Sequence, residues 1–190
     1  MNRTEVIVFG GGCFWCTEAV FLRLKGVTSV MSGYAGGLST HSTDAQGLGQ
    51  APTYEEVSTG RTGHAEVIHI EYDPTVIPFS KLLEVFFMAH DPTTVNRQGA
   101  DVGEQYRSII LWTNEDQKRE AELFIAELTA GKKFPEPIVT EVKALERFWP
   151  AEEYHRDYYA KHSGEAYSQA IIAPKIRKLK REHSDLLAES

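Results

Sequence analysis

The apolar and polar residues of this chain follow patterns that predict four strands and two helices. Short runs of β-branched and aromatic side chains between glycines and polar residues are typical of strands. Apolar residues three or four positions apart are typical of helices. By these patterns we expect strands at residues 5–9, 27–35, 64–72 and 107–112, and helices at residues 14–25 and 79–89.

These elements follow one another as strand, helix, strand, strand, helix, strand. That order predicts an α+β fold with a ferredoxin-like split β-α-β core sheet, helices on one face and long loop insertions. A further helix at 114–131 and a short strand at 138–143 complete the pattern. We expect a single domain over residues 1–190, with its core at about 5–160 and a C-terminal extension at 161–190.

Two segments outside the predicted elements have patterns of their own. Residues 36–53 are rich in Gly, Ser, Thr and Gln and exceed an ordinary connection in length, which predicts a functional or mobile loop. In the extension, four residues at helical spacing are surrounded by lysines and arginines, which predicts a docked surface helix with a solvated basic face. These four residues are Ile176, Leu179, His183 and Leu186.

Composition excludes several classes of protein. With 42% hydrophobic and 25% charged residues, the chain of 190 residues can form a sizeable core, which argues against disorder. The 20 Lys and Arg residues against 27 Asp and Glu residues give a net charge of −7, which argues against nucleic acid or an anionic membrane as a partner. No apolar run approaches the roughly 20 residues of a membrane span, and the N-terminus lacks a signal-peptide pattern. We therefore expect a cytoplasmic protein.

The only two cysteines, Cys13 and Cys16, follow three glycines at the end of the first predicted strand. A turn at the glycines would place Cys13 at the start of the helix expected from Phe14. Unpaired backbone N–H groups and the helix dipole favour an anion there, so we expect the pKa of the Cys13 thiol to be lowered. In a reducing compartment, such a pair indicates redox or metal chemistry more often than a structural bridge.

Four interpretations of this pair are open from the residues alone. Both sulfurs are expected on the helix stripe that faces the sheet edge, where a nucleophile and a resolving partner can meet. A zinc site would need two more ligands, but His64 and His69 point to opposite faces of a strand. A thioredoxin-like disulfide exchanger usually has small residues or proline between its cysteines, where this chain has Phe14 and Trp15. The fourth interpretation is two buried cysteines that only pack.

Glu66 is the candidate general acid. Strand alternation places it on the same side as Ile68, Ile70 and Tyr72, toward the apolar layer. Burial there would raise the pKa of the carboxyl group, so that it holds a proton near neutral pH. The alternative is that Glu66 bends out to water or pairs with Arg61.

Four other polar residues carry weaker signals. Tyr54 and Tyr106 precede predicted strands and are placed to reach a site at the sheet edge, although each by itself is more typical of a structural tyrosine. Glu152 and His155 fit a helix-start carboxylate and a structural histidine.

Short motifs follow one another in a fixed order along the chain. They are GCFW at 12–15, SGYAGG at 32–37, YEEV at 54–57, TGHAE at 62–66, YDP at 72–74, HDP at 90–92, RQGADVGEQYRS at 97–108 and FWPAEEYH at 148–155. In residue type and order they closely resemble the peptide methionine sulfoxide reductase A family, over about residues 5–160. The resemblance implies a catalytic domain that reduces methionine-S-sulfoxide, free or in proteins, with no metal, flavin or nicotinamide cofactor.

For the thiols, the resemblance implies that Cys13 is the nucleophile and that Phe14 and Trp15 receive the methyl group of the substrate. The reaction leaves a sulfenic acid on Cys13, which a second thiol condenses to a disulfide. Many family members carry resolving cysteines in a C-terminal tail, whereas this chain has none after Cys16. Our hypothesis is that Cys16 resolves the sulfenic acid, on an intact or an unwound first helical turn, and that thioredoxin or another dithiol reduces the bond.

For the polar groups, the resemblance implies that Glu66 is the acid, that Tyr54 and Tyr106 hydrogen-bond the sulfoxide oxygen, and that Asp101 helps to order the site. The chemistry agrees, because a sulfoxide oxygen is a poor leaving group until it is protonated. Two other functions stay open. One is a general protein disulfide exchanger, and the other is a sulfoxide-binding module or redox sensor that does not turn over.

Overall fold

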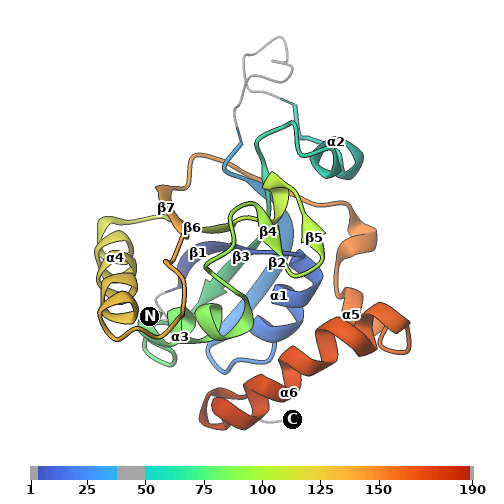
Figure 1. Ribbon diagram of the computed structural model, residues 1–190. Coiled ribbons are helices and arrows are strands. Elements are labelled where there is room, and N and C mark those ends of the chain that lie inside the picture. The colour runs from blue at the N-terminus through green and yellow to red at the C-terminus, as the bar shows by residue number, and fades with distance from the viewer. Residues whose placement is uncertain (1–3, 38–49, 189–190) are drawn as a thin grey trace.

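The computed structural model describes residues 4–37 and 50–188, so most of the loop expected at 36–53 lies outside the described residues. At the centre is a six-stranded sheet in the order β7-β6-β1-β3-β2-β8 (Figure 1). Its strands are β1 (Glu5–Gly11), β2 (Val27–Ala35), β3 (Ala65–Tyr72), β6 (Ser108–Trp112), β7 (Glu141–Ala144) and β8 (Phe148–Pro150). The four main predicted strands and the short strand β7 are confirmed. The sequence does not predict β8, because three residues are too few for a periodic signal.

The pairing of the strands brings the end of β1 beside the beginning of β3. β1 pairs antiparallel with β3 and β6, and β2 pairs antiparallel with β3 and β8, whereas β7 runs parallel to β6. Because Phe9 pairs with Ile68, the glycine turn after β1 lies next to Glu66 on β3. A separate two-stranded sheet joins β4 (Arg97–Gln98) to β5 (Asp101–Val102). The fold is therefore of the mixed α+β class, as predicted.

The helices are α1 (Phe14–Phe21), α2 (Tyr54–Ser58), α3 (Phe79–Ala89), α4 (Glu115–Ala130), α5 (Tyr158–Lys161) and α6 (Ala173–Glu182). The predictions for α3 and α4 are confirmed, but the prediction that the first helix reaches residue 25 is wrong. After Phe21 the backbone tightens, since the N–H groups of Arg23 and Leu24 donate to carbonyls only three residues back. Lys25 then donates to Leu186, and this contact with the C-terminal segment draws the chain away from the helix axis.

The two faces of the sheet are covered differently. One face and helices α1, α3 and α4 enclose the large core, in which Phe9, Ile68 and Phe86 are fully buried. The opposite face carries a smaller cluster that includes Val67 and is covered by Phe148. The helices that pack on the large core thus lie on one face, where Glu66 also points.

The C-terminal extension docks onto this helical layer, as predicted. Figure 1 shows α6 crossing below α1, and Ile176 and Leu179 of α6 are buried. A single π-helical turn (Ser168–Ile172) leads into α6, and Leu186 beyond it is also buried. Among the described residues, no helix is both long and apolar enough to cross a membrane.

Candidate active site

The turn between β1 and α1 presents Cys13 at the start of the helix. Gly12 has a φ of 90°, and a Cβ at this position would lie 2.5 Å from Cγ of Gln98. Only glycine fits this conformation and this space. The backbone N–H of Cys16 donates to the carbonyl of Cys13 over 3.1 Å, so the two cysteines share one tight turn.

Glu66 occupies the buried position that strand alternation predicts. Its side chain does not reach out to water or to Arg61, because the residue is only 2% exposed and its Oε2 accepts the backbone N–H of Phe14 over 3.1 Å. Burial raises the pKa of Glu66 to about 8, with the negative charge of Asp101 adding to the effect and the Phe14 N–H opposing it. The carboxyl group therefore holds a proton at neutral pH and also anchors the start of α1.

Tyr54, Tyr106 and Asp101 gather around this carboxyl group. Tyr54 begins α2, and Tyr106 ends a short 3-10 turn at Glu104–Tyr106. Burial raises the pKa of both phenols, and the charges of Glu66 and Cys13 act on each of them. Burial also raises the pKa of Asp101, whereas Lys175 lowers it. Two protonated phenols thus lie within electrostatic reach of the acid and the cysteine.

His155 and Glu152, which the sequence assigns to structural roles, hold the aromatic residues of the site. The indole Nε1–H of Trp15 donates to Nδ1 of the buried His155 over 3.0 Å. Glu152 accepts the backbone N–H of Tyr54 and the hydroxyl of Tyr34, each over 2.8 Å. Glu152 does precede a short helical turn, but its carboxylate reaches across to α2 and β2 and does not cap that turn. The two residues therefore position the aromatic groups around Cys13.

The aromatic pair after Cys13 divides into a buried and an accessible ring. Phe14 is 1% exposed and lies against Tyr34 and His155, with ring centroids 5.9 and 5.0 Å away. Trp15 is half-buried and stacks on Tyr158 at 3.7 Å. An apolar group that enters beside Cys13 would therefore meet Trp15 first, with Phe14 beneath it.

The structure corrects two expectations about the cysteines. Cys16 packs with Ala19 against Ile172 and Ile176, and Cys13 packs against the same cluster, so the two cysteines share one side, as predicted, but that side faces the C-terminal segment and not the sheet edge. Both thiols are free, and their interaction raises the pKa of Cys13 and lowers that of Cys16, so a charge on one disfavours a charge on the other.

The pKa of Cys16 is lowered to about 7 by the hydrogen bond from Cys13, by Lys175 and by Tyr167, with burial opposing. The pKa of Cys13 is raised by that same contact with Cys16, by burial and by Glu66, against the expectation of a lowered value. Of the two thiols, Cys16 is therefore the one that loses its proton more readily when no substrate is bound. The position of Cys13 at the start of the helix does not lower its pKa, because the interaction with Cys16, burial and Glu66 raise it.

Tyr167 is the site residue that the sequence does not reveal. Its hydroxyl lies 3.7 Å from Sγ of Cys16, and Tyr167 lowers the pKa of both thiols. The contact joins residues 151 positions apart, and no local motif in the extension marks this tyrosine.

Across residues 4–37 and 50–188, no three or more His, Cys, Asp or Glu side chains form a group able to hold a metal ion. The reactive groups that the structure brings together at the site are two thiols, a carboxylic acid and phenols.

Comparisons with known proteins match this chain to one family of reductases. The family model described as "Peptide methionine sulfoxide reductase" matches residues 5–187. "Peptide methionine sulfoxide reductase MsrA" of Sulfolobus acidocaldarius is 52% identical over 183 residues, which cover 95% of this chain and 96% of that protein.

Two solved structures have the same fold. Reduced Mxr1 from Saccharomyces cerevisiae is 32% identical with a TM-score of 0.77, and the match covers 86% of this chain and 88% of that one. Methionine sulfoxide reductase A of Corynebacterium diphtheriae is 33% identical with a TM-score of 0.71, covering 86% and 77%. The match to the family model, which runs to residue 187, includes the C-terminal helix as well as the sheet.

Proposed function

The chain belongs to the peptide methionine sulfoxide reductase family, and on this premise we propose that it reduces methionine-S-sulfoxide, free or in proteins, to methionine with thiols as the electron source. The observation that carries the proposal is the buried carboxyl group of Glu66, which accepts the backbone N–H of Phe14, the residue after Cys13. A disulfide exchanger depends less on an acid, because its leaving group is a thiolate, which can depart without a proton. A sulfoxide needs one, because its oxygen leaves only with a proton.

In the first step, the sulfur of Cys13 attacks the sulfoxide sulfur while Glu66 gives its proton to the oxygen. Tyr54 and Tyr106 donate hydrogen bonds to that oxygen, which stabilises the charge that develops on it. The S–O bond of the substrate breaks, two electrons pass from Cys13 to the substrate, and methionine leaves. Cys13 keeps the oxygen as a sulfenic acid, and Asp101 helps to order the donors.

Phe14 and Trp15 receive the methyl group of the substrate. The accessible face of Trp15, held by His155, supports this assignment, since a methyl group that packs on an indole loses contact with water. The S epimer follows from the family and from the rule that each sulfoxide epimer has its own enzyme.

In the second step, Cys16 attacks the sulfenic acid, the disulfide forms and the oxygen leaves as water. The shared turn supports this step on an intact helix start, because the thiols already contact each other there. We propose that thioredoxin or another dithiol reduces the bond, without a bound cofactor. Such reductants are supplied by the cytoplasm, where we expect the protein to act as a single catalytic domain. The antiparallel order β6-β1-β3-β2 at the centre of the sheet supports the ferredoxin-like description of that domain.

The experiment that tests this function measures reduction of each separate methionine sulfoxide epimer with dithiothreitol as the reductant. The wild-type protein is compared with Cys13→Ser, Glu66→Gln and the control Glu71→Gln, which changes a half-buried carboxylate on the same strand. We expect turnover of the S epimer by the wild type and by Glu71→Gln, no turnover by Cys13→Ser and a large loss in Glu66→Gln. Full activity of Cys13→Ser, or an equally active Glu66→Gln, would contradict the proposal.

A further inference from the structure

The C-terminal segment delivers a hydroxyl group to the two cysteines. Tyr167 lies just before the π-helical turn, and its hydroxyl lies 3.7 Å from Sγ of Cys16. Its ring packs edge-on against Trp15, with centroids 5.9 Å apart. A phenol with a raised pKa keeps its proton, so near a thiolate it acts as a hydrogen-bond donor.

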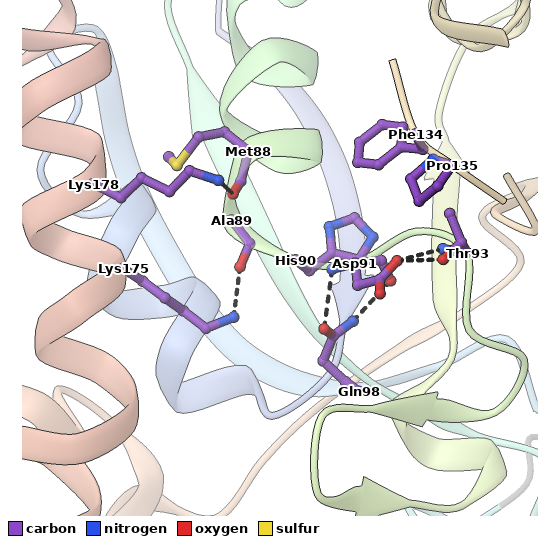
Figure 2. A pocket seen from close by; sticks show the side chains of 10 residues that line it. All are labelled: Met88, Ala89, His90, Asp91, Thr93, Gln98, Phe134, Pro135, Lys175 and Lys178. Atoms are coloured by element: carbon purple, nitrogen blue, oxygen red, sulfur yellow. Dashed lines mark hydrogen bonds between the residues drawn. The ribbon is translucent and has the colours of Figure 1, made fainter. Parts of the chain in front are cut away.

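Two lysines of α6 fix this segment against the rest of the molecule. Figure 2 shows Lys175 and Lys178 reaching across one side of a cleft to the last two residues of α3. Nζ of Lys175 donates to the carbonyl of Ala89 over 2.5 Å, and Nζ of Lys178 donates to that of Met88 over 3.0 Å. Cations at a helix C-terminus are favourable, so both contacts hold α6 in place. Of the two lysines, Lys175 is the one whose charge acts on Cys16.

We propose that Cys16 acts twice, first as the base that accepts the proton of Cys13 and then as the resolving thiol, and that Tyr167 and Lys175 are the groups that stabilise its negative charge. The inference rests on the proposed function, since it assigns the proton transfer within that reaction. It makes the C-terminal helix part of the thiol chemistry, although that helix carries no cysteine.

The protons and electrons of the cycle balance with these groups. At the start Cys16 is a thiolate, Cys13 is a thiol and Glu66 is protonated. When Cys13 attacks, its proton passes to Cys16 and the proton of Glu66 passes to the oxygen, which leaves a sulfenic acid, a Cys16 thiol and a Glu66 carboxylate. Cys16 then attacks the sulfenic sulfur, its proton leaves with the hydroxyl group as water, and the S–S bond forms as the S–O bond breaks. The dithiol supplies two electrons to reduce that bond, and its protons restore the acid.

Among the described residues, four charged or titratable groups act on the pKa of Cys16, and they lie on different parts of the chain. Cys13 at the helix start, Tyr167 and Lys175 favour its thiolate, whereas Asp101 of β5 disfavours it. The negative charge of Cys16 also raises the pKa of Glu66 on β3. Because Glu66 is neutral at rest, Asp101 is the one carboxylate in this group that opposes the thiolate at neutral pH.

The first test measures where Cys16 ionises. In a Cys13→Ser background Cys16 is the only thiol, and its thiolate absorbance in the ultraviolet can be followed against pH, with Cys13→Ser, Cys16→Ser as the blank. We expect a midpoint below the ordinary value of a cysteine thiol, because Lys175 and Tyr167 remain and the serine hydroxyl can donate a hydrogen bond in place of the Cys13 thiol. Adding Tyr167→Phe should raise the midpoint by about one pH unit, the size of a hydrogen bond to a charged group. Lys175→Met should raise it by a smaller amount.

Matched controls separate these effects from a loss of structure. Tyr159→Phe removes a hydroxyl from a ring that packs on the same cluster, and Lys178→Met removes the neighbouring lysine contact. Neither change should move the midpoint. A Tyr167→Phe titration that overlays its parent, or equal shifts in Tyr159→Phe, would overturn the role of Tyr167.

The second test follows a single turnover in the full chain with both thiols. Methionine release reports the first step and the disulfide reports the second. In Tyr167→Phe the rise of methionine release with pH should move to higher pH, and in Cys16→Ser the release should fall at least tenfold at pH 7. An unchanged rate of methionine release in Cys16→Ser would refute the base role while leaving the proposed function intact. A wild-type protein that releases no methionine at all would instead refute the proposed function.

Discussion

The N-termini of α1 and α4 meet the same physical need in opposite ways. The first backbone N–H groups of any helix lack partners within the helix. At α4, Asn114 accepts the N–H of Gln117 over 2.9 Å, and Glu115 and Asp116 add negative charge to the first turn. At α1, the capping residue is Cys13, its side chain accepts no capping hydrogen bond, and the first turn has no acidic residue.

The difference shows how a helix start becomes available for chemistry. Every partner at α4 is a neighbour in the sequence, so the cap stabilises that helix and does nothing else. At α1 the N–H of Phe14 goes to Glu66, a residue 52 positions away on another strand. The start of α1 is thereby joined to the acid of the site, and the side chain of Cys13 is left free to react. The following variants test this contrast, beginning with the largest effect.

Replacement of Cys13 by serine should abolish sulfoxide reduction without weakening the fold. Serine is a preferred N-cap residue and cysteine is not, so the free energy of unfolding should rise by up to about 1 kcal/mol. Activity with dithiothreitol and thermal unfolding measure the two effects. A clearly lower unfolding temperature would mean that the thiol at the start of α1 is needed for stability, contrary to the comparison.

Replacement of Glu66 by glutamine should lower turnover by about 100-fold to 10,000-fold, the usual share of general acid catalysis. The wild-type rate should fall as the pH rises through about 8, because the carboxyl group then loses its proton. Glutamine should remove this alkaline limb, since it has no proton to lose. A variant that keeps the same alkaline limb would assign the limb to another group.

The pH dependence of stability should also distinguish Glu66 from an exposed carboxylate. Its pKa is about 4.3 in an unfolded chain and about 8 in the fold. The folded state therefore binds more protons between these values, so the contribution is fully present below about pH 4 and is lost as the pH rises through about 8. Glu66→Gln should flatten the fall of the free energy of unfolding over this window, as measured by urea unfolding. An unchanged slope would show that the carboxyl group is not protonated in the fold.

Replacement of Asn114 by alanine should cost about 1 kcal/mol of stability, because the N–H of Gln117 loses its cap. Turnover at 25 °C should stay at the wild-type level, since α4 lies apart from the cysteines. Urea unfolding and steady-state kinetics on one preparation compare the two readouts. A loss of turnover in the folded variant would show that the two helix starts are coupled.

Replacement of Glu115 by glutamine should have the smallest effect, about 0.3 kcal/mol at low salt, from weaker interaction with the helix dipole. The side chain is 74% exposed, so added salt should screen the difference between variant and wild type. A loss that persists in high salt would indicate a specific contact at this position.

Much of the fold and part of the site follow from sequence patterns. The alternation in β3 is sufficient to predict which face of the sheet Glu66 points to, because a strand residue has only two faces to choose from. The caps of α4 are equally readable, since Asn114 and the acidic first turn are local. The early end of α1 is not readable, because the contact of Lys25 with Leu186 depends on the docked C-terminal segment. Tyr167 is hidden for the same reason.

By itself, the sequence determined which groups are available and which faces are apolar: two thiols after a glycine turn, one acid on the buried side of a strand, and phenols nearby. Only the tertiary structure decided which thiol carries the charge. Hydrogen bonds and charges act over a few ångströms in space: the contact between the two thiols lowers the pKa of Cys16 and raises that of Cys13, and Lys175 of the distant helix α6 favours the Cys16 thiolate further. The residue pattern of the GCFWC segment does not predict these contacts, so the lowered pKa that we expected at Cys13 is found at Cys16.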